Sequence, residues 1–186
     1  MGTLLWRVFP RGGKYPGNWS EFRAYGPTQS RFDHHPVRGK PRVHRGYGIL
    51  YAADDYTAAI AEYFQVRRAI NRKRNKPWLV QFTLTKPLVL VDVTGPWLLQ
   101  AGGNGAIATG PRVQSRKWSR LFHRAWPKIH GICYRSSLNP DWIAYALYER
   151  AYRAMPRMPL LHAPLLDARL DPLLAKAATV SGYKLL

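Results

Sequence analysis

Every apolar segment of this chain is short, and this limits what the chain can fold into. No apolar run approaches the roughly 18 residues that a membrane-spanning helix requires. Among the 186 residues, 46% are hydrophobic and 13% are aromatic, which is enough for a buried core and argues against a wholly disordered chain. The length suits one domain rather than two independent ones. The sequence therefore predicts one folded domain without a membrane association, and its 15 Gly and 15 Pro predict many loops.

The first residues and the single cysteine bear on the compartment and on metal binding. Residues 1–10 lack the basic and then apolar layout of a secretory signal, so we expect a cytoplasmic protein. Cys133 is the only cysteine, which excludes an internal disulfide and a zinc site built from several thiolates. His34 and His35 are adjacent, but no third His or Cys stands at a recognised ligand spacing. We therefore expect no metal.

Positive charge dominates the composition. Twenty-nine Lys and Arg against 10 Asp and Glu give a formal net charge of +19, which attracts polyanions and phosphorylated ligands. Nucleic acid, a nucleotide and an acidic protein all fit this charge, and so does an ordinary solvated basic surface. The basic run over residues 67–76, with Trp78 beside it, is the best nucleic-acid feature. The alternative interpretation is the solvated basic end of a helix.

Short β-rich segments and a few helical patterns alternate along the chain. Strands are predicted over residues 3–9, 47–52, 78–84, 88–93, 130–135 and 143–148. Residues 10–46 have little periodicity and are predicted to be a long loop, and residues 101–110 a Gly- and Ala-rich loop. Helices are predicted over 113–126 and, more weakly, over 165–178, where Pro172 would interrupt. Another helix is predicted from an N-cap at Asp54–Asp55 through Ile70.

Two charged residues stand out against their apolar surroundings. Glu62 lies at the edge of the apolar stripe of the helix predicted through Ile70, which suggests partial burial beside a groove. A carboxylate there needs protein cations or ligand hydroxyls as partners, and an ordinary salt bridge is the alternative. Strand alternation places Arg7 on the face opposite Trp6 and Val8, where a structural ion pair is again the alternative. No phosphate-binding glycine motif of the P-loop or Rossmann type is present.

Taken in order, four segments resemble the RES domain family, which is named after an Arg, a Glu and a Ser and includes toxins of bacterial toxin–antitoxin pairs. The segments are Leu5–Val8, Ser30–Asp33, Gly48–Ala53 followed by Ala58–Glu62, and Gly131–Ser137. Each motif is short, so the specificity lies in their order over about residues 3–149. The chain departs from the family pattern at Phe32–Asp33, where a Trp-Asn pair is usual, and at Arg135, where Pro is frequent. The loop between Arg31 and Tyr51 is also longer than usual.

The resemblance implies a compact α+β fold, with a mixed sheet and flanking helices, related to ADP-ribosyltransferases. It implies that residues 1–149 form a catalytic domain that binds NAD+. We expect residues 150–186, which are rich in Pro and Leu, to form an extension packed on the same domain.

The resemblance also implies roles for individual residues. The expected catalytic residues are Arg7, Arg31, Tyr51, Glu62 and Ser136, and the expected NAD+-binding residues are Arg7, Arg31, Phe32, Tyr51, Ser119 and Ser137. The two guanidinium groups suit a pyrophosphate, and a fixed Glu62 carboxylate suits the positive charge that develops on the ribose. Tyr51 would stack on the substrate, or else serve as a core aromatic. Ser136 would orient the substrate, although Ser137 and Ser119 are alternative serines.

Three functions follow as hypotheses. The first is a RES-type toxin that cleaves the nicotinamide glycosidic bond of NAD+, by hydrolysis or phosphorolysis, and needs no metal. The second is an ADP-ribosyltransferase toxin that modifies a protein. The third is a basic module that binds nucleic acid without catalysis. For the first two, the expected partners are NAD+ and an acidic antitoxin or immunity protein, a homodimer is an option, and nucleic acid binds only nonspecifically.

Overall fold

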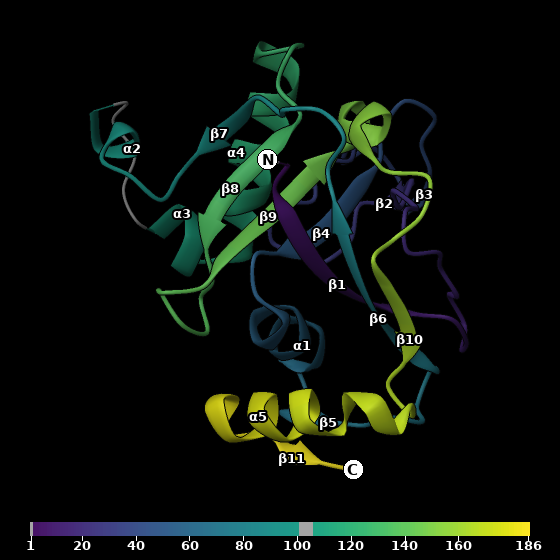
Figure 1. The fold of residues 1–186 in the computed structure, drawn as a ribbon. Helices are drawn as coiled ribbons and strands as arrows, with labels where there is room; N and C mark the ends of the chain where they lie inside the picture. Colours follow the sequence, from purple (N-terminus) through teal and green to yellow (C-terminus); the bar gives the residue numbers. More distant parts are fainter. Residues whose placement is uncertain (1, 101–105) are drawn as a thin grey trace.

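The computed structural model describes residues 2–100 and 106–186, and its centre is a seven-stranded sheet (Figure 1). The strand order is β10-β6-β1-β4-β9-β8-β7. Neighbouring strands are antiparallel except β7 and β8, which are parallel. The strands are β1 (Leu4–Pro10), β4 (Ile49–Ala53), β6 (Pro77–Thr83), β7 (Leu90–Asp92), β8 (Gly131–Arg135), β9 (Ile143–Tyr148) and β10 (Leu161–Pro164).

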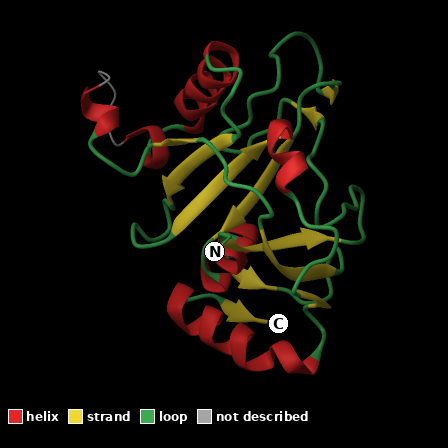
Figure 2. Ribbon diagram, turned by 45° about the horizontal axis from the view of Figure 1, so that its top comes forward, coloured by secondary structure: helices red, strands yellow, loops and turns green. Residues whose placement is uncertain are grey.

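Helices and two small strand pairs surround this sheet (Figure 2). The helices are α1 (Tyr56–Phe64), α2 (Trp97–Gln100), α3 (Ala106–Thr109), α4 (Arg112–Ala125), α5 (Asp171–Ser181) and the 3-10 helices η1 (Glu149–Ala154) and η2 (Ala168–Leu170). The small pairs join β2 (Tyr25–Gly26) to β3 (Arg42–Val43) and β5 (Ala69–Ile70) to β11 (Lys184–Leu185). The predicted α+β class, with a mixed sheet and flanking helices, is confirmed. The relation to ADP-ribosyltransferases stays a prediction.

Alternation along the strands divides the core between the two faces of the sheet. On one face, Ala146 and Tyr148 of β9 pack with Phe122 of α4. Val8 of β1 belongs to a second cluster, which it shares with residues of α1 and α5. Between α5 and the sheet lies α1 (Figure 1). The opposite face forms a third cluster, to which β9 contributes Leu147.

No helix within the described residues is long and apolar enough to cross a membrane.

The sheet opens between β1 and β4. Strand β1 pairs with β6 through seven residues, but with β4 only through Trp6 opposite Ala53. Trp6 and Ala53 are the only register pair between these two strands, and residues from both strands line a cavity. The splayed pair is therefore the structural reason that a cavity can form in the middle of the sheet.

The prediction of a helix through Ile70 was wrong at its C-terminal end. Helix α1 ends at Phe64, with Gln65 as its C-cap, and has no basic residue in its last turn. Arg68 has a φ of 50°, in the left-handed region that a continuing α-helix does not use. Ile70 instead pairs with Leu185 in the β5–β11 pair and is fully buried. Pairing with the C-terminus of the chain therefore overrides the local helical pattern.

Other departures from the expected elements lie in loops and near the C-terminus. Residues 101–105 of the predicted Gly- and Ala-rich loop lie outside the described residues, and α3 forms in its second half. Helix α5 begins at Asp171, so Pro172 falls in the first turn, where a missing N–H removes no helical hydrogen bond. Pro172 therefore does not interrupt the helix. Strand β10, which pairs with β6, was not predicted.

Candidate active site

A cavity of about 490 Å³ lies where β1, β4, α1 and the start of α4 meet. This volume is in the range of small-molecule sites. Four of the five residues predicted to be catalytic line it, namely Arg7, Arg31, Tyr51 and Glu62. Its other polar lining residues include Arg23, Gln29, Ser30, Tyr63, Gln65, Arg112 and Tyr134. The structure thus brings together charged groups from distant parts of the sequence.

Helix α1 positions Glu62. Asp55 caps the helix by accepting hydrogen bonds from Thr57 N (2.7 Å) and Ala58 N (3.2 Å). The next turns bury Ile60 and Ala61 in the core, which fixes the rotation of the helix about its axis. Glu62 is half-buried at the margin of this apolar face, as the periodicity predicted.

Each carboxylate oxygen of Glu62 accepts a hydrogen bond. Ser136 Oγ donates to Glu62 Oε1 at 2.7 Å, and Gln65 Nε2 donates to Oε2 at 2.9 Å. Ser136 is buried directly after β8 and itself accepts a hydrogen bond from Leu138 N. Ser136 is not among the cavity-lining residues. The predicted serine therefore contacts the predicted glutamate and holds its side chain in one orientation.

Gln65 connects Glu62 to the start of α4. Its Nε2 also donates to the backbone oxygen of Glu62 (2.8 Å), and its Oε1 accepts from Arg112 Nη2 (2.7 Å). Arg112 is the first residue of α4. A chain of hydrogen bonds therefore runs from α4 through one amide to the carboxylate on α1.

Arg7 is anchored by backbone oxygens rather than by an acid. Its Nη1 donates to the carbonyl oxygens of Trp19 (3.0 Å) and Glu21 (3.1 Å), which belong to the loop after β1. Burial lowers the pKa of Arg7 to about 10, and the nearby charge of Glu21 opposes this effect. The guanidinium is therefore still charged at neutral pH.

Arg31 is anchored in the same way, by a backbone oxygen. Its Nη1 donates to the carbonyl oxygen of Gly110 at 2.7 Å, just before α4. Burial lowers the pKa of Arg31, and the positive charge of Arg112 lowers it further. Two guanidinium groups are thus held close enough to repel each other.

The cavity carries a positive charge that the protein leaves uncompensated. Among the described residues, Arg7, Arg31 and Arg112 form no ion pair with a carboxylate, whereas Arg23 is paired with Asp33 at 2.9 Å. Glu62 is the only acidic residue in the lining formed by the described part of the chain. Buried charges are usually paired, so this arrangement suits an anionic ligand.

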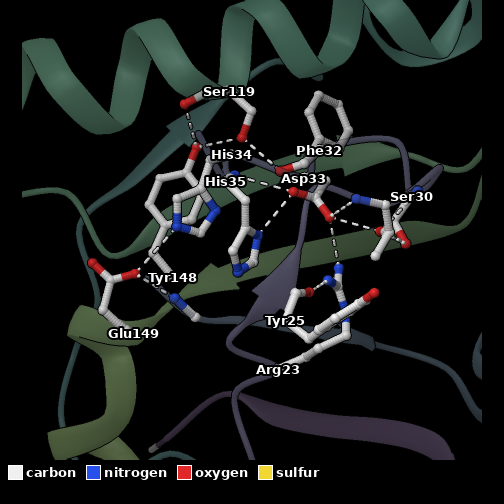
Figure 3. A network of polar contacts seen from close by, with 12 residues as sticks. Arg23, Tyr25, Ser30, Phe32, Asp33, His34, His35, Ser119, Tyr148 and Glu149 are labelled. Atoms are coloured by element: carbon white, nitrogen blue, oxygen red, sulfur yellow. Dashed lines mark hydrogen bonds and ion pairs between the residues drawn. The ribbon is translucent and has the colours of Figure 1, made fainter. Parts of the chain in front are cut away.

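The loop that carries Arg31 is held in place by Asp33 (Figure 3). This fully buried carboxylate accepts hydrogen bonds from Arg23 Nη2 (2.9 Å), Thr28 N (2.9 Å), Thr28 Oγ1 (2.6 Å), His35 N (3.0 Å) and His35 Nδ1 (2.8 Å). Burial alone would raise the pKa of Asp33, but the hydrogen bonds from His35 and Thr28 outweigh it and keep the group ionised. Asp33 thus fixes the loop on both sides of Arg31.

Three residues predicted to bind NAD+ do not line the cavity. Phe32 is fully buried and packs against Tyr134, with ring centroids 4.6 Å apart. Ser119 on α4 donates from Oγ to the backbone oxygen of Phe32 at 2.6 Å and lies 2.9 Å from Tyr148 Oη. Phe32 and Ser119 therefore anchor the Arg31 loop to the core. Ser137 is exposed in the turn after β8.

Tyr51 and Tyr134 supply the aromatic part of the lining. Burial raises the pKa of both phenols above their usual value, so both are neutral at physiological pH. They offer ring surface in a cavity that also contains guanidinium groups, a combination that suits the ring of a nucleotide-like ligand.

The sequence analysis missed Arg23, Gln65, Arg112 and Tyr134. For Gln65 a signal existed, because residues three apart on a helix share a face, and Gln65 is three residues after Glu62. Arg112 is 47 residues from its partner Gln65, and no local pattern links the two.

Comparison with known proteins identifies a family for this chain. A family model for the RES domain matches residues 4–171. Comparison with curated proteins finds no match. The matched region extends from the first strand to the start of α5 and includes all the cavity-lining residues named above. The chain therefore belongs to the RES domain family.

Proposed function

We propose that this protein binds NAD+ in the cavity between β1 and β4 and cleaves its nicotinamide glycosidic bond. One observation carries the proposal: the cavity holds three guanidinium groups without acidic partners among the described residues and one carboxylate fixed at both oxygens. Membership of the RES family supports a toxin-associated domain and an enzyme related to NAD.

The guanidinium groups account for binding. The pyrophosphate of a dinucleotide offers oxygen acceptors that match the planar fork of Arg. Arg7 reaches the cavity from β1, and Arg31 reaches it from the loop between β2 and β3. A bound pyrophosphate between them would compensate the charge that the protein leaves unpaired.

The carboxylate accounts for catalysis. When the bond between ribose and nicotinamide breaks, positive charge develops on the ribose ring, and neutral nicotinamide leaves with the bonding electron pair. A carboxylate that is already oriented stabilises this charge more than it stabilises the substrate, which lowers the barrier. Ser136 and Gln65 hold Glu62 in place, so the side chain does not have to reorganise during the step. Water or phosphate would then receive the ADP-ribosyl group.

The substitution Glu62→Gln tests this proposal. It keeps the size of the side chain and removes the charge, so nicotinamide release from NAD+ should fall by at least about 100-fold. The fold should persist, because Glu62 is at the margin of the core. The measurement is nicotinamide release by purified protein, with and without phosphate, together with the thermal midpoint of each variant.

A matched control is Asp92→Asn, which removes an exposed carboxylate on β7, outside the cavity. This variant should release nicotinamide like the unaltered protein. Transfer of the label from NAD+ to a protein would instead support an ADP-ribosyltransferase. If the unaltered protein releases no nicotinamide, either with or without phosphate, the proposal is overturned.

A further inference from the structure

A second cluster of polar side chains lies outside the cavity lining. It consists of His34 from the loop after Arg31, His123 from α4 and Glu149 at the start of η1. His34 Nε2 is 3.2 Å from Glu149 Oε2 (Figure 3), and His123 Nε2 is 2.8 Å from Glu149 Oε1. The two nitrogens and the carboxylate oxygen all lie within 4.8 Å of one another.

The donor set is one that transition-metal ions use. Two imidazole nitrogens and one carboxylate oxygen form a ligand set known for Zn²⁺, with a fourth position left for water. Zinc holds such ligands at roughly 2.0–2.2 Å, so the ligand atoms of one ion lie within about 4 Å of one another. The present spacing of up to 4.8 Å is close to that distance. We propose that His34, His123 and Glu149 form a binding site for one divalent transition-metal ion of the zinc type.

The surroundings of the three side chains favour binding. The side chain of His34 is 0% exposed, that of His123 is 9% exposed and that of Glu149 is 25% exposed, so little water competes for the ligand atoms. His34 Nδ1 is buried without a hydrogen-bond partner in the described structure, so with the ring proton on Nδ1 the lone pair of Nε2 is directed to the cluster.

The position of the cluster indicates a structural role for the ion. It would join three segments that are far apart in sequence: the Arg31 loop, α4 and the start of η1. Arg31 precedes His34 by three residues, so an ion at His34 would stiffen the loop that places Arg31 in the cavity. The proposed reaction needs no metal, and this site does not depend on that reaction.

Direct hydrogen bonding is the competing explanation of the same geometry. Without an ion, the two imidazoles lie within hydrogen-bond distance of Glu149, and Gly48 N also donates to Oε2 at 3.0 Å. In that case the cluster is satisfied without a metal, and the protein should take up none.

Zinc titration separates these two explanations. The full chain, without a purification tag, is dialysed against EDTA, freed of the chelator and titrated with Zn²⁺ by calorimetry. We expect one equivalent to bind, and a rise in Tm of roughly 5–10 °C when free Zn²⁺ is 100-fold above Kd. His123→Ala should weaken binding by more than about 100-fold, whereas His162→Ala, a histidine exposed on β10, should bind like the unaltered protein.

A second measurement covers the case in which His123→Ala does not fold. X-ray absorption at the zinc edge of the unaltered protein, loaded with one equivalent, should show nitrogen and oxygen neighbours with imidazole scattering. Absence of stoichiometric binding, or equal binding by folded His123→Ala, would overturn the proposal. Neither readout involves NAD+, so the result is independent of the proposed catalytic function.

Discussion

At the scale of single residues, the site depends on how Glu62 is held. Ser136 and Gln65 donate to its two oxygens, and Arg112 at the start of α4 donates to Gln65. Because the Gln65 amide donates to Glu62 and accepts from Arg112, its two ends cannot be exchanged without breaking both hydrogen bonds. Gln65 is therefore a positioning residue, since it acts through Glu62.

The substitution Gln65→Glu tests this positioning role. The new carboxylate can still accept from Arg112, but it places a second negative charge beside Glu62, which disfavours the ionised form of the pair. As the pH falls, the variant should therefore lose its charged carboxylate, and with it its activity, at a higher pH than the unaltered protein does. We expect the acid limb of kcat/KM against pH to move upward by roughly one pH unit.

The control for this experiment is Gln114→Glu, which makes the same change at an exposed position of α4 outside the cavity lining. Its acid limb should match that of the unaltered protein. If the two profiles of Gln65→Glu and Gln114→Glu coincide, Gln65 does not act through Glu62.

At the scale of elements, the C-terminal segment supports the helix that carries Glu62. Helix α5 packs on α1, and β10 pairs with β6 at the edge of the sheet. Leu174 on α5 is fully buried in one cluster with Ile60 and Ala61 of α1. We therefore expect residues 150–186 to unfold together with the rest of the chain.

Leu174→Ala should destabilise the protein by about 2–5 kcal/mol, because it removes a buried side chain and leaves a cavity. Urea denaturation measures this change, and one cooperative transition should be seen for both proteins. Leu166→Ala, at an exposed position (52%), should change the stability by less than about 0.5 kcal/mol. Two separate transitions would show that the C-terminal segment is an independent unit.

At the scale of the whole molecule, the +19 charge is divided between the cavity and the surface. The basic run over residues 67–76 lies after α1, where Arg67, Arg68, Arg74 and Lys76 are exposed. Arg72 is instead paired with Asp171 at 2.7 Å. Trp78, next to the run, packs against His162 with ring centroids 4.7 Å apart. The surface part of the charge thus suits nonspecific binding of phosphates.

Replacing Arg67, Arg68, Arg74 and Lys76 by Gln should weaken binding to duplex DNA and reduce its salt dependence. The slope of log K against log salt should become shallower by up to about 0.9 for each DNA phosphate that the variant no longer neutralises. Nicotinamide release should be unchanged, because none of the four lines the cavity. If the four Gln substitutions abolish the biological activity of the protein and Glu62→Gln leaves it intact, the result would favour a nucleic-acid-binding module.

The sequence by itself determined much of the local structure and the family of the chain. Alternation and caps located β1, the start of α1, and β8 and β9, because side chains that are buried on one face recur at regular intervals in the sequence. The order of short motifs indicated the RES family and singled out Arg7, Arg31, Tyr51, Glu62 and Ser136. All of these lie at the cavity or bind a residue that does.

Only the tertiary structure decided which groups meet. The hydrogen bonds between Gln65 and Arg112, and between Ser119 and the loop at Phe32, span 47 and 87 residues. His34 meets Glu149 across 115 residues, so spacing along the chain hid a set of possible metal ligands. Periodicity reports whether a side chain is buried, but the packing of the sheet and helices decides which buried side chains become neighbours.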